Sequence, residues 1–344
     1  ITAFVVFILV IVLMLMMGKG SKEQKNQVLF KRTDGMTDFG MMGNNLFYTY
    51  SGKLYCVSSN GEQKYDIAID KNVKQIVYGL SKIYILNADR TILQIDAKTG
   101  SILNRIDVKD ANEIQVKGDQ LIVLGDSAFY VYNDMKLSST KETKGMPKKY
   151  AKNGEYSAWI EIGEQEHVES EGNVGVDPEF ESTLVTGEHN KFTIEKNNKK
   201  LFGFATSSQD FNDIIPIGED GFLLIGDKDI YFFVDGKLKF SKKVIYFKDI
   251  EISKDQIAVL DGNDLIVMNM DGNITNIYSM QHDAKNVLFN GKEILLFGYD
   301  VIIKKEDEEL IATKSKDIYK IIKNEDGSIL LIYSDHVERF SLAE

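Results

Sequence analysis

Similar turns recur along this chain at nearly constant intervals, and this regularity restricts the folds that the chain can adopt. From about residue 28 onward, short runs rich in Ile, Val, Tyr and Phe alternate with turn residues. Comparable turns recur 35 to 39 residues apart within unbroken runs, at Gly61, Gly100, Met135, Gly236, Gly272 and Asp307. A repeat near 35 residues holding about four strands is typical of a β-propeller, whose small sheets stack around an axis because none can bury both faces alone.

The repeat predicts an all-β fold, a β-propeller of about seven or eight four-stranded blades. The wider interval between Met135 and Gly236 should hold one or two further units and an insertion, and the segment near residues 28–33 should complete the last blade. The apolar segments 121–124, 257–260 and 294–297 have matching places in the repeat, so we expect them at equivalent central positions in their blades. A pair of two-sheet β-sandwiches is the alternative arrangement of the same strands.

The stretch from Thr91 to Val108, TILQIDAKTGSILNRIDV, resembles the strand–Asp–x–x–Thr–Gly–strand of quinoprotein-type (PQQ-like) propeller repeats. The resemblance implies the propeller fold. That family often places a Trp in each blade, whereas Trp159 is the only Trp here. We therefore expect the fold without a quinone, and no other cofactor is indicated.

The first seventeen residues, ITAFVVFILVIVLMLMM, are apolar except for Thr2. At about 1.5 Å per residue they would form a helix of roughly 26 Å, close to the ~30 Å hydrocarbon core of a bilayer. Residues 1–17 are therefore predicted to be a transmembrane or filament-core α-helix that precedes the propeller, residues 18–27 a polar linker, and residues 28–344 the propeller domain. The domain is expected to lie outside the cytoplasm, either anchored at a membrane or built into a surface filament.

The filament alternative comes from a resemblance. An unbroken aliphatic helix ahead of a globular head is similar to type IV pilins and related filament proteins, in which such helices bundle into the filament core. Bacterial pilins usually carry a Glu at the fifth position, where this chain has Val5. The resemblance covers only residues 1 to about 25.

Composition and motifs speak against a catalytic or metal-dependent role. The net charge of −11 argues against nucleic-acid binding, and the single Cys56 excludes a cysteine-rich metal site. The histidines lack metal-ligand spacing and are expected at the surface or in turns: His167, His189, His282 and His336. The segment from Asp261 to Leu265 begins like a calcium loop but places Leu265 at a ligand position. The chain is thus predicted not to be an enzyme, with no metal and no cofactor.

Opposite charges gather in one region, an acidic insertion predicted at about residues 161–190. Nine acids and no Lys or Arg lie between Glu161 and Glu188, and a basic run precedes them. A solvated loop is the plain interpretation. The functional one is a pair of patches that dock subunits or partners: Lys141, Lys144, Lys148, Lys149 and Lys152 against Glu161, Glu164, Glu166, Glu169 and Glu171.

The sequence therefore predicts a non-catalytic, membrane-anchored or cell-surface propeller whose faces bind protein partners or copies of itself, and which contacts the membrane through residues 1–17. The alternative is the repeating subunit of a pilin-like filament. An enzyme with a site on the propeller axis is a third hypothesis, because propellers can assemble sites from several blades.

Overall fold

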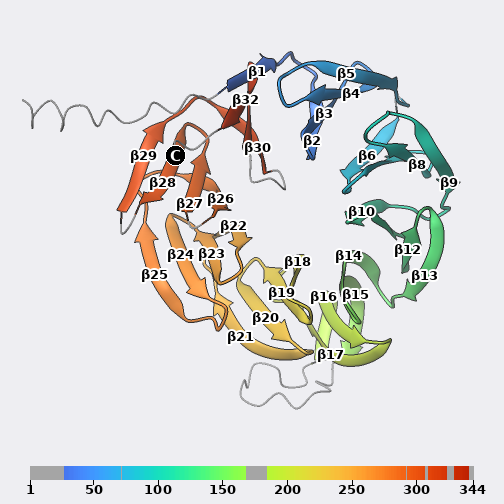
Figure 1. Ribbon diagram of the computed structural model, residues 1–344. Coiled ribbons are helices and arrows are strands. Elements are labelled where there is room, and N and C mark those ends of the chain that lie inside the picture. The colour runs from blue at the N-terminus through green and yellow to red at the C-terminus, as the bar shows by residue number, and fades with distance from the viewer. Residues whose placement is uncertain are drawn as a thin grey trace, which may run out of the picture.

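Eight four-stranded antiparallel sheets stand around a common axis in the computed structural model (Figure 1). The structure describes residues 27–70, 72–167, 184–291, 293–306, 309–323 and 329–340. In Figure 1 the first strand of each blade lies nearest the axis and the fourth lies outermost. The propeller is confirmed, with eight blades, and the alternative of paired sandwiches is wrong.

The strands of the first four blades follow one another along the chain. They are β2 Thr37–Met42, β3 Asn45–Tyr50, β4 Lys53–Ser58 and β5 Gln63–Ala68; β6 Val73–Tyr78, β7 Lys82–Asn87, β8 Thr91–Asp96 and β9 Ile102–Asp107; β10 Glu113–Lys117, β11 Gln120–Leu124, β12 Ala128–Asn133 and β13 Lys136–Glu142; β14 Met146–Asn153, β15 Tyr156–His167, β16 Leu184–Lys196 and β17 Lys199–Thr206.

The last four blades continue this order, and the eighth takes its outermost strand from the start of the chain. They are β18 Phe211–Ile217, β19 Gly221–Gly226, β20 Asp229–Val234 and β21 Lys237–Lys243; β22 Phe247–Ile252, β23 Gln256–Asp261, β24 Asp264–Asn269 and β25 Ile274–Ser279; β26 Ala284–Asn290, β27 Glu293–Gly298, β28 Val301–Glu306 and β29 Glu309–Lys314; β30 Ile318–Lys323, β31 Ile329–Tyr333, β32 His336–Phe340 and β1 Gln27–Lys31.

The ring is closed by the two ends of the described chain. Strand β1 pairs antiparallel with β32, from Gln27 opposite Arg339 to Lys31 opposite His336. This confirms that the segment near residues 28–33 completes the last blade. On the inner side, Lys320 of the eighth blade donates to the carbonyl of Phe39 in the first blade at 2.7 Å.

The core lies between neighbouring blades. Second strands face a neighbour on both sides, so they are nearly continuous apolar runs and not alternating ones. Strand β19 is buried along its whole length, and β11, β23 and β27 are buried except at their first or last residues. The segments 121–124, 257–260 and 294–297 are all second strands, which confirms their predicted equivalence.

The turns counted in the sequence all join the third and fourth strands of a blade. The wide interval holds one further unit, whose equivalent turn is Asn197–Asn198, with both residues at positive φ. Asn tolerates this conformation better than most residues, so it replaces Gly or Asp at the turn. The insertion lies in that fourth blade, between β15 and β16.

The predicted N-terminal helix needs correction as part of the fold. The described residues form strands, turns and bends with no α-helix, and so the fold established here is the propeller alone. Residues 1–17 and most of the predicted linker lie outside the described residues. No helix long and apolar enough to cross a membrane occurs within the described ranges.

An irregularity recurs where first strands begin. In seven of the eight blades the pairing of the first and second strands shifts register there, as between Val73 and Gln75 or Phe247 and Asp249. Such a β-bulge adds an unpaired residue and redirects its side chain. The bulge residue is Lys74, Lys148, Lys248 or Lys285 in four blades, whereas the first blade has Asp38 within its bulge.

Candidate functional site

One end of the propeller carries a polar pocket and an exposed apolar connection, and both features suit binding. We call it the pocket face: the end formed by the turns between second and third strands and by the connections between blades. Strands β15 and β16, with 12 and 13 residues, are longer than the other strands, and their extra residues extend toward this face. The chain between them, 168–183, lies outside the described residues.

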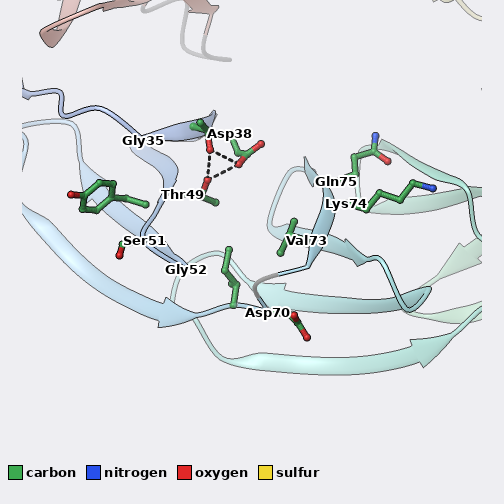
Figure 2. A pocket seen from close by; sticks show the side chains of 12 residues that line it. Gly35, Asp38, Thr49, Ser51, Gly52, Asp70, Val73, Lys74 and Gln75 are labelled. Atoms are coloured by element: carbon green, nitrogen blue, oxygen red, sulfur yellow. Dashed lines mark hydrogen bonds between the residues drawn. The ribbon is translucent and has the colours of Figure 1, made fainter.

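A pocket of about 480 Å³ opens on this face between the first and second blades. Its walls come from the start of β2, the turn between β3 and β4, and the start of β6, and most of the groups that line it are polar (Figure 2). The lining residues are Gly35, Thr37, Asp38, Thr49, Tyr50, Ser51, Gly52, Ile69, Asp70, Val73, Lys74 and Gln75.

Asp38 is held in an unusual conformation at the mouth of this pocket. Its φ is 50°, in the left-handed region that few non-glycine residues adopt. The hydroxyls of Thr37 and Thr49 both donate to its Oδ2, at 2.9 and 2.5 Å, and Tyr78 donates to its carbonyl (Figure 2). Burial raises the pKa of Tyr78, so its hydroxyl stays a donor. Backbone and carboxylate are thus both fixed.

The other long polar side chains of the pocket are oriented differently. Lys74 directs its ammonium away from Asp38 in Figure 2. Gln75 also turns away, because it pairs with the third blade: its Oε1 accepts from the Ile114 amide at 2.7 Å and its Nε2 donates to the Ile114 carbonyl at 2.9 Å. Asp70 accepts from the amide of Asn72 at 2.9 Å. Asp38 is therefore the carboxylate that Thr37 and Thr49 fix within the pocket.

The second feature is a short connection, Ile245–Tyr246, which leads from the fifth blade into the sixth. Ile245 is 93% exposed and Tyr246 is 68% exposed. Both amides donate to the carboxylate of Asp261, at 3.0 and 2.5 Å, and the Gly262 amide donates to the Tyr246 carbonyl at 2.7 Å. Two large apolar side chains are thus presented to solvent on a fixed backbone.

Two further tyrosines are exposed on the pocket face in the next blades around the ring. Tyr299, in the turn between β27 and β28, has Lys285 at 5.8 Å from its ring centroid, and a hydrogen bond to Asp317 raises the pKa of its hydroxyl. Tyr319, at the bulge of β30, has the Arg32 guanidinium at 4.3 Å from its ring. Ile245, Tyr246, Tyr299 and Tyr319 together form what we call the aromatic arc, over blades six to eight.

The structure uses two of the predicted docking residues inside the chain. Lys141 of β13 pairs with Glu195 of β16 at 2.6 Å and lies 4.5 Å from the centroid of the Trp159 ring. Glu161 is only 4% exposed; it pairs with Lys191 at 3.3 Å and accepts from the Lys144 amide at 3.2 Å. The Lys141–Glu195 pair joins the third blade to the fourth, whereas Glu161 pairs within the fourth blade and accepts from the connection that leads into it.

The remaining predicted charges are placed in part. Lys148, Lys149 and Lys152 lie on β14, where Lys148 contacts the Asn190 side chain at 3.5 Å and the Lys152 carbonyl accepts from Lys117. The backbones of Glu164 and Glu166 belong to β15, opposite Glu188 and Val185, but their side chains are outside the described residues, as are Glu169 and Glu171. Docking through these patches stays a prediction.

Of the three histidines whose side chains the structure describes, one departs from expectation. His189 is 2% exposed within the fourth blade and is not a surface residue. His282 is exposed in a connection between blades, and His336 stacks on Tyr333 with ring centroids 4.5 Å apart. His167 ends β15, and its side chain is not described. Across the described ranges, no group of three or more His, Cys, Asp or Glu side chains could hold a metal ion.

Sequence reasoning missed both Asp38 and the Ile245–Tyr246 connection. The signal for Asp38 was available: it is an acid where four other blades place Lys. Ile245 and Tyr246 carry no such signal, because an apolar pair between strands is indistinguishable from the start of the next buried strand until the turn is known.

No family model matches the chain, and no curated protein matches its sequence. Solved structures of the same shape do exist, at very low sequence identity. A computationally designed protein, Ika8, has a TM-score of 0.65 at 8% identity over 93% of this chain and all of its own. A eukaryotic initiation factor structure has a TM-score of 0.60 at 11% identity, covering 89% and 84% of the two chains. A chain of the mitotic checkpoint complex has a TM-score of 0.53 at 8% identity, covering 94% of each. These likenesses support the fold alone.

Proposed function

We propose that this chain is a non-catalytic interaction module whose pocket face binds protein partners. The observation that carries the proposal is the Ile245–Tyr246 connection, where two large apolar side chains are exposed and the backbone is fixed by Asp261. Exposed aromatic residues on a rigid support are typical of binding hot spots, because little conformational entropy is lost when they dock.

The rest of the aromatic arc supports this role. Tyr299 and Tyr319 extend the exposed aromatic surface across two further blades on the same face. Tyrosine is enriched at protein interfaces because its ring buries apolar area while its hydroxyl keeps a hydrogen bond. Among the structures of similar shape, one is a chain of a multiprotein assembly, the mitotic checkpoint complex.

The apolar residues 1–17 favour a membrane as the place of action. Seventeen nearly uninterrupted apolar side chains favour hydrocarbon over water. We therefore propose that this segment holds the propeller at a membrane. Alkaline extraction of membranes tests it: the full chain should stay with the bilayer, and deletion of residues 1–17 should release it. Long polymers in place of membrane-bound protein would favour the pilin-like filament.

Site-specific photocrosslinking tests the interaction. A photoreactive residue in place of Ile245 should give a discrete adduct with another protein in native membranes. The matched control replaces Ile102, which is 59% exposed but lies on the outermost strand β9. Adducts of equal yield from both positions, or none from Ile245, would contradict the proposal.

A further inference from the structure

The pocket of the first blade presents hydrogen-bond acceptors. A hydroxyl has one proton, and the two protons of the Thr37 and Thr49 hydroxyls are taken up by the three contacts that link these hydroxyls to each other and to Asp38 Oδ2. Their lone pairs, together with Asp38 Oδ1, remain as acceptors, and among the described residues none donates to that Oδ1. A group that fits must therefore bring donors, and the charge of Asp38, with which the Lys320 ammonium of the eighth blade also interacts, favours a cation.

The geometry points to a binding site for one primary ammonium or guanidinium group. Both groups carry several N–H donors and no acceptor, and a bond from such a cation to a carboxylate is stronger than a neutral one. The pocket volume of about 480 Å³ accommodates an arginine-sized side chain. A divalent metal suits the pocket less, because Ca²⁺ takes six to eight oxygen ligands.

The first blade differs from the other blades at the bulge residue, which is the residue that would bind the cation. Four other blades place lysine at the bulge, and the first blade alone combines an acid there with a left-handed backbone and two supporting threonines. Residues that break a local rule in an otherwise regular fold mark functional positions. The cation comes either from a protein side chain, in which case the inference adds to the proposed function, or from a free amine.

Calorimetric titration of the full chain in detergent tests this with two guanidinium probes. One is the peptide acetyl-Ala-Arg-Ala-amide and the other is agmatine, a free amine. We expect at least one to bind, and the tighter of the two identifies the source. The same peptide with citrulline, which is neutral, should bind at least tenfold more weakly. Equal binding of the citrulline peptide, or no binding of either probe, would overturn the inference.

Three variants test whether the cation binds at Asp38 in the pocket of the first blade. Asp38→Asn removes the charge but keeps an acceptor for the threonines, and Asn tolerates the left-handed backbone, so the fold should hold while binding falls about tenfold or more. Asp126→Asn, an exposed acid on the same face outside the pocket, loses the same charge and should bind normally. Lys74→Gln removes the cation of the lining and should tighten binding up to about threefold.

These variants also separate this inference from the proposed function. Asp38→Asn is expected to leave the crosslinks formed from position 245 in place if the pocket takes a free amine. If Asp38→Asn leaves probe binding unchanged, or Asp126→Asn weakens it as much, the cation site is wrong whatever the crosslinking shows. An unchanged thermal unfolding midpoint confirms that the variants fold.

Discussion

Lys141 and Glu195 form an ion pair of 2.6 Å between the outermost strand of the third blade and the third strand of the fourth. The Glu195 side chain is 9% exposed and that of Lys141 is 28% exposed, so both charges are largely removed from water. Removing one partner of such a pair leaves the other buried and uncompensated, which costs more than the intact pair contributes.

Lys141→Met should therefore lower the free energy of unfolding by roughly 1–3 kcal/mol. Adding Glu195→Gln should recover part of that loss, because the uncompensated charge disappears; urea unfolding of the single and double variants measures the coupling. Lys53→Met breaks a more exposed pair with Asp66 and should change stability much less, because water screens that pair. Strictly additive effects of Lys141→Met and Glu195→Gln would contradict a structural pair.

The Lys141–Glu195 pair shows which features could be predicted from the sequence and which could not. The basic and acidic runs were recognisable, but whether Lys141 faces solvent or the next blade depends on strand register, which charge patterning does not encode. Periodicity succeeded for the blades because the third-to-fourth turns of the first six blades each place one or two residues at positive φ, which favours Gly, Asn and Asp. Periodicity could not decide between seven and eight blades, because the third-to-fourth turn of the fourth blade, Asn197–Asn198, contains neither Gly nor Asp.

The candidate site could be predicted less well than the fold. Asp38 depends on a bulge, and bulges follow from backbone pairing and not from residue type. The pocket further needs Thr49 of β3 beside Thr37 of β2, a contact fixed by register at 2.8 Å. Ile245 and Tyr246 are exposed because Asp261 holds their amides, which only the folded chain brings together.

Closure of the ring gives a second prediction, at Gly61. This residue has φ of +87°, and an added Cβ would meet the carbonyl oxygen of Leu29 in the closing strand β1. Gly61→Ala should cost roughly 2–4 kcal/mol, combining backbone strain with displacement of β1. Gly52→Ala is the control, since its φ is +75° and its Cβ would meet nothing within 4 Å; it should cost only about 1–2 kcal/mol. Equal thermal destabilisation by both would show that β1 does not close the ring there.

Asp249 gives a prediction of pH dependence. Burial raises its pKa, although it accepts from the Val287 amide of the next blade at 2.9 Å. A raised pKa in the folded state means that the stability from this group is present at low pH and lost as pH rises through the folded pKa. Asp249→Asn imitates the protonated acid, so it should stabilise the protein at neutral pH by up to about 1 kcal/mol. The gain should vanish near pH 4, around the ordinary Asp value.

Asp235 should behave in the opposite way. The Tyr156 hydroxyl donates to it and lowers its pKa, so its contribution is present above the ordinary Asp value and lost as pH falls. Asp235→Asn should therefore destabilise at neutral pH and have little effect in acid. Thermal unfolding of both variants from pH 3 to 8 measures the two trends; parallel trends for the two variants would refute the assignment.

The account depends most on the Ile245–Tyr246 connection, and affinity for the partner crosslinked there tests it most directly. Tyr246→Ala should raise the Kd for that purified partner more than tenfold, because truncating a central aromatic anchor typically costs about 2 kcal/mol or more. Leu80→Ala removes a side chain of similar exposure, 59%, in the turn between β6 and β7 at the opposite end of the propeller, and should leave the Kd unchanged. An unchanged Kd for Tyr246→Ala, with weaker binding for Leu80→Ala, would place the interface on the other face and contradict the account.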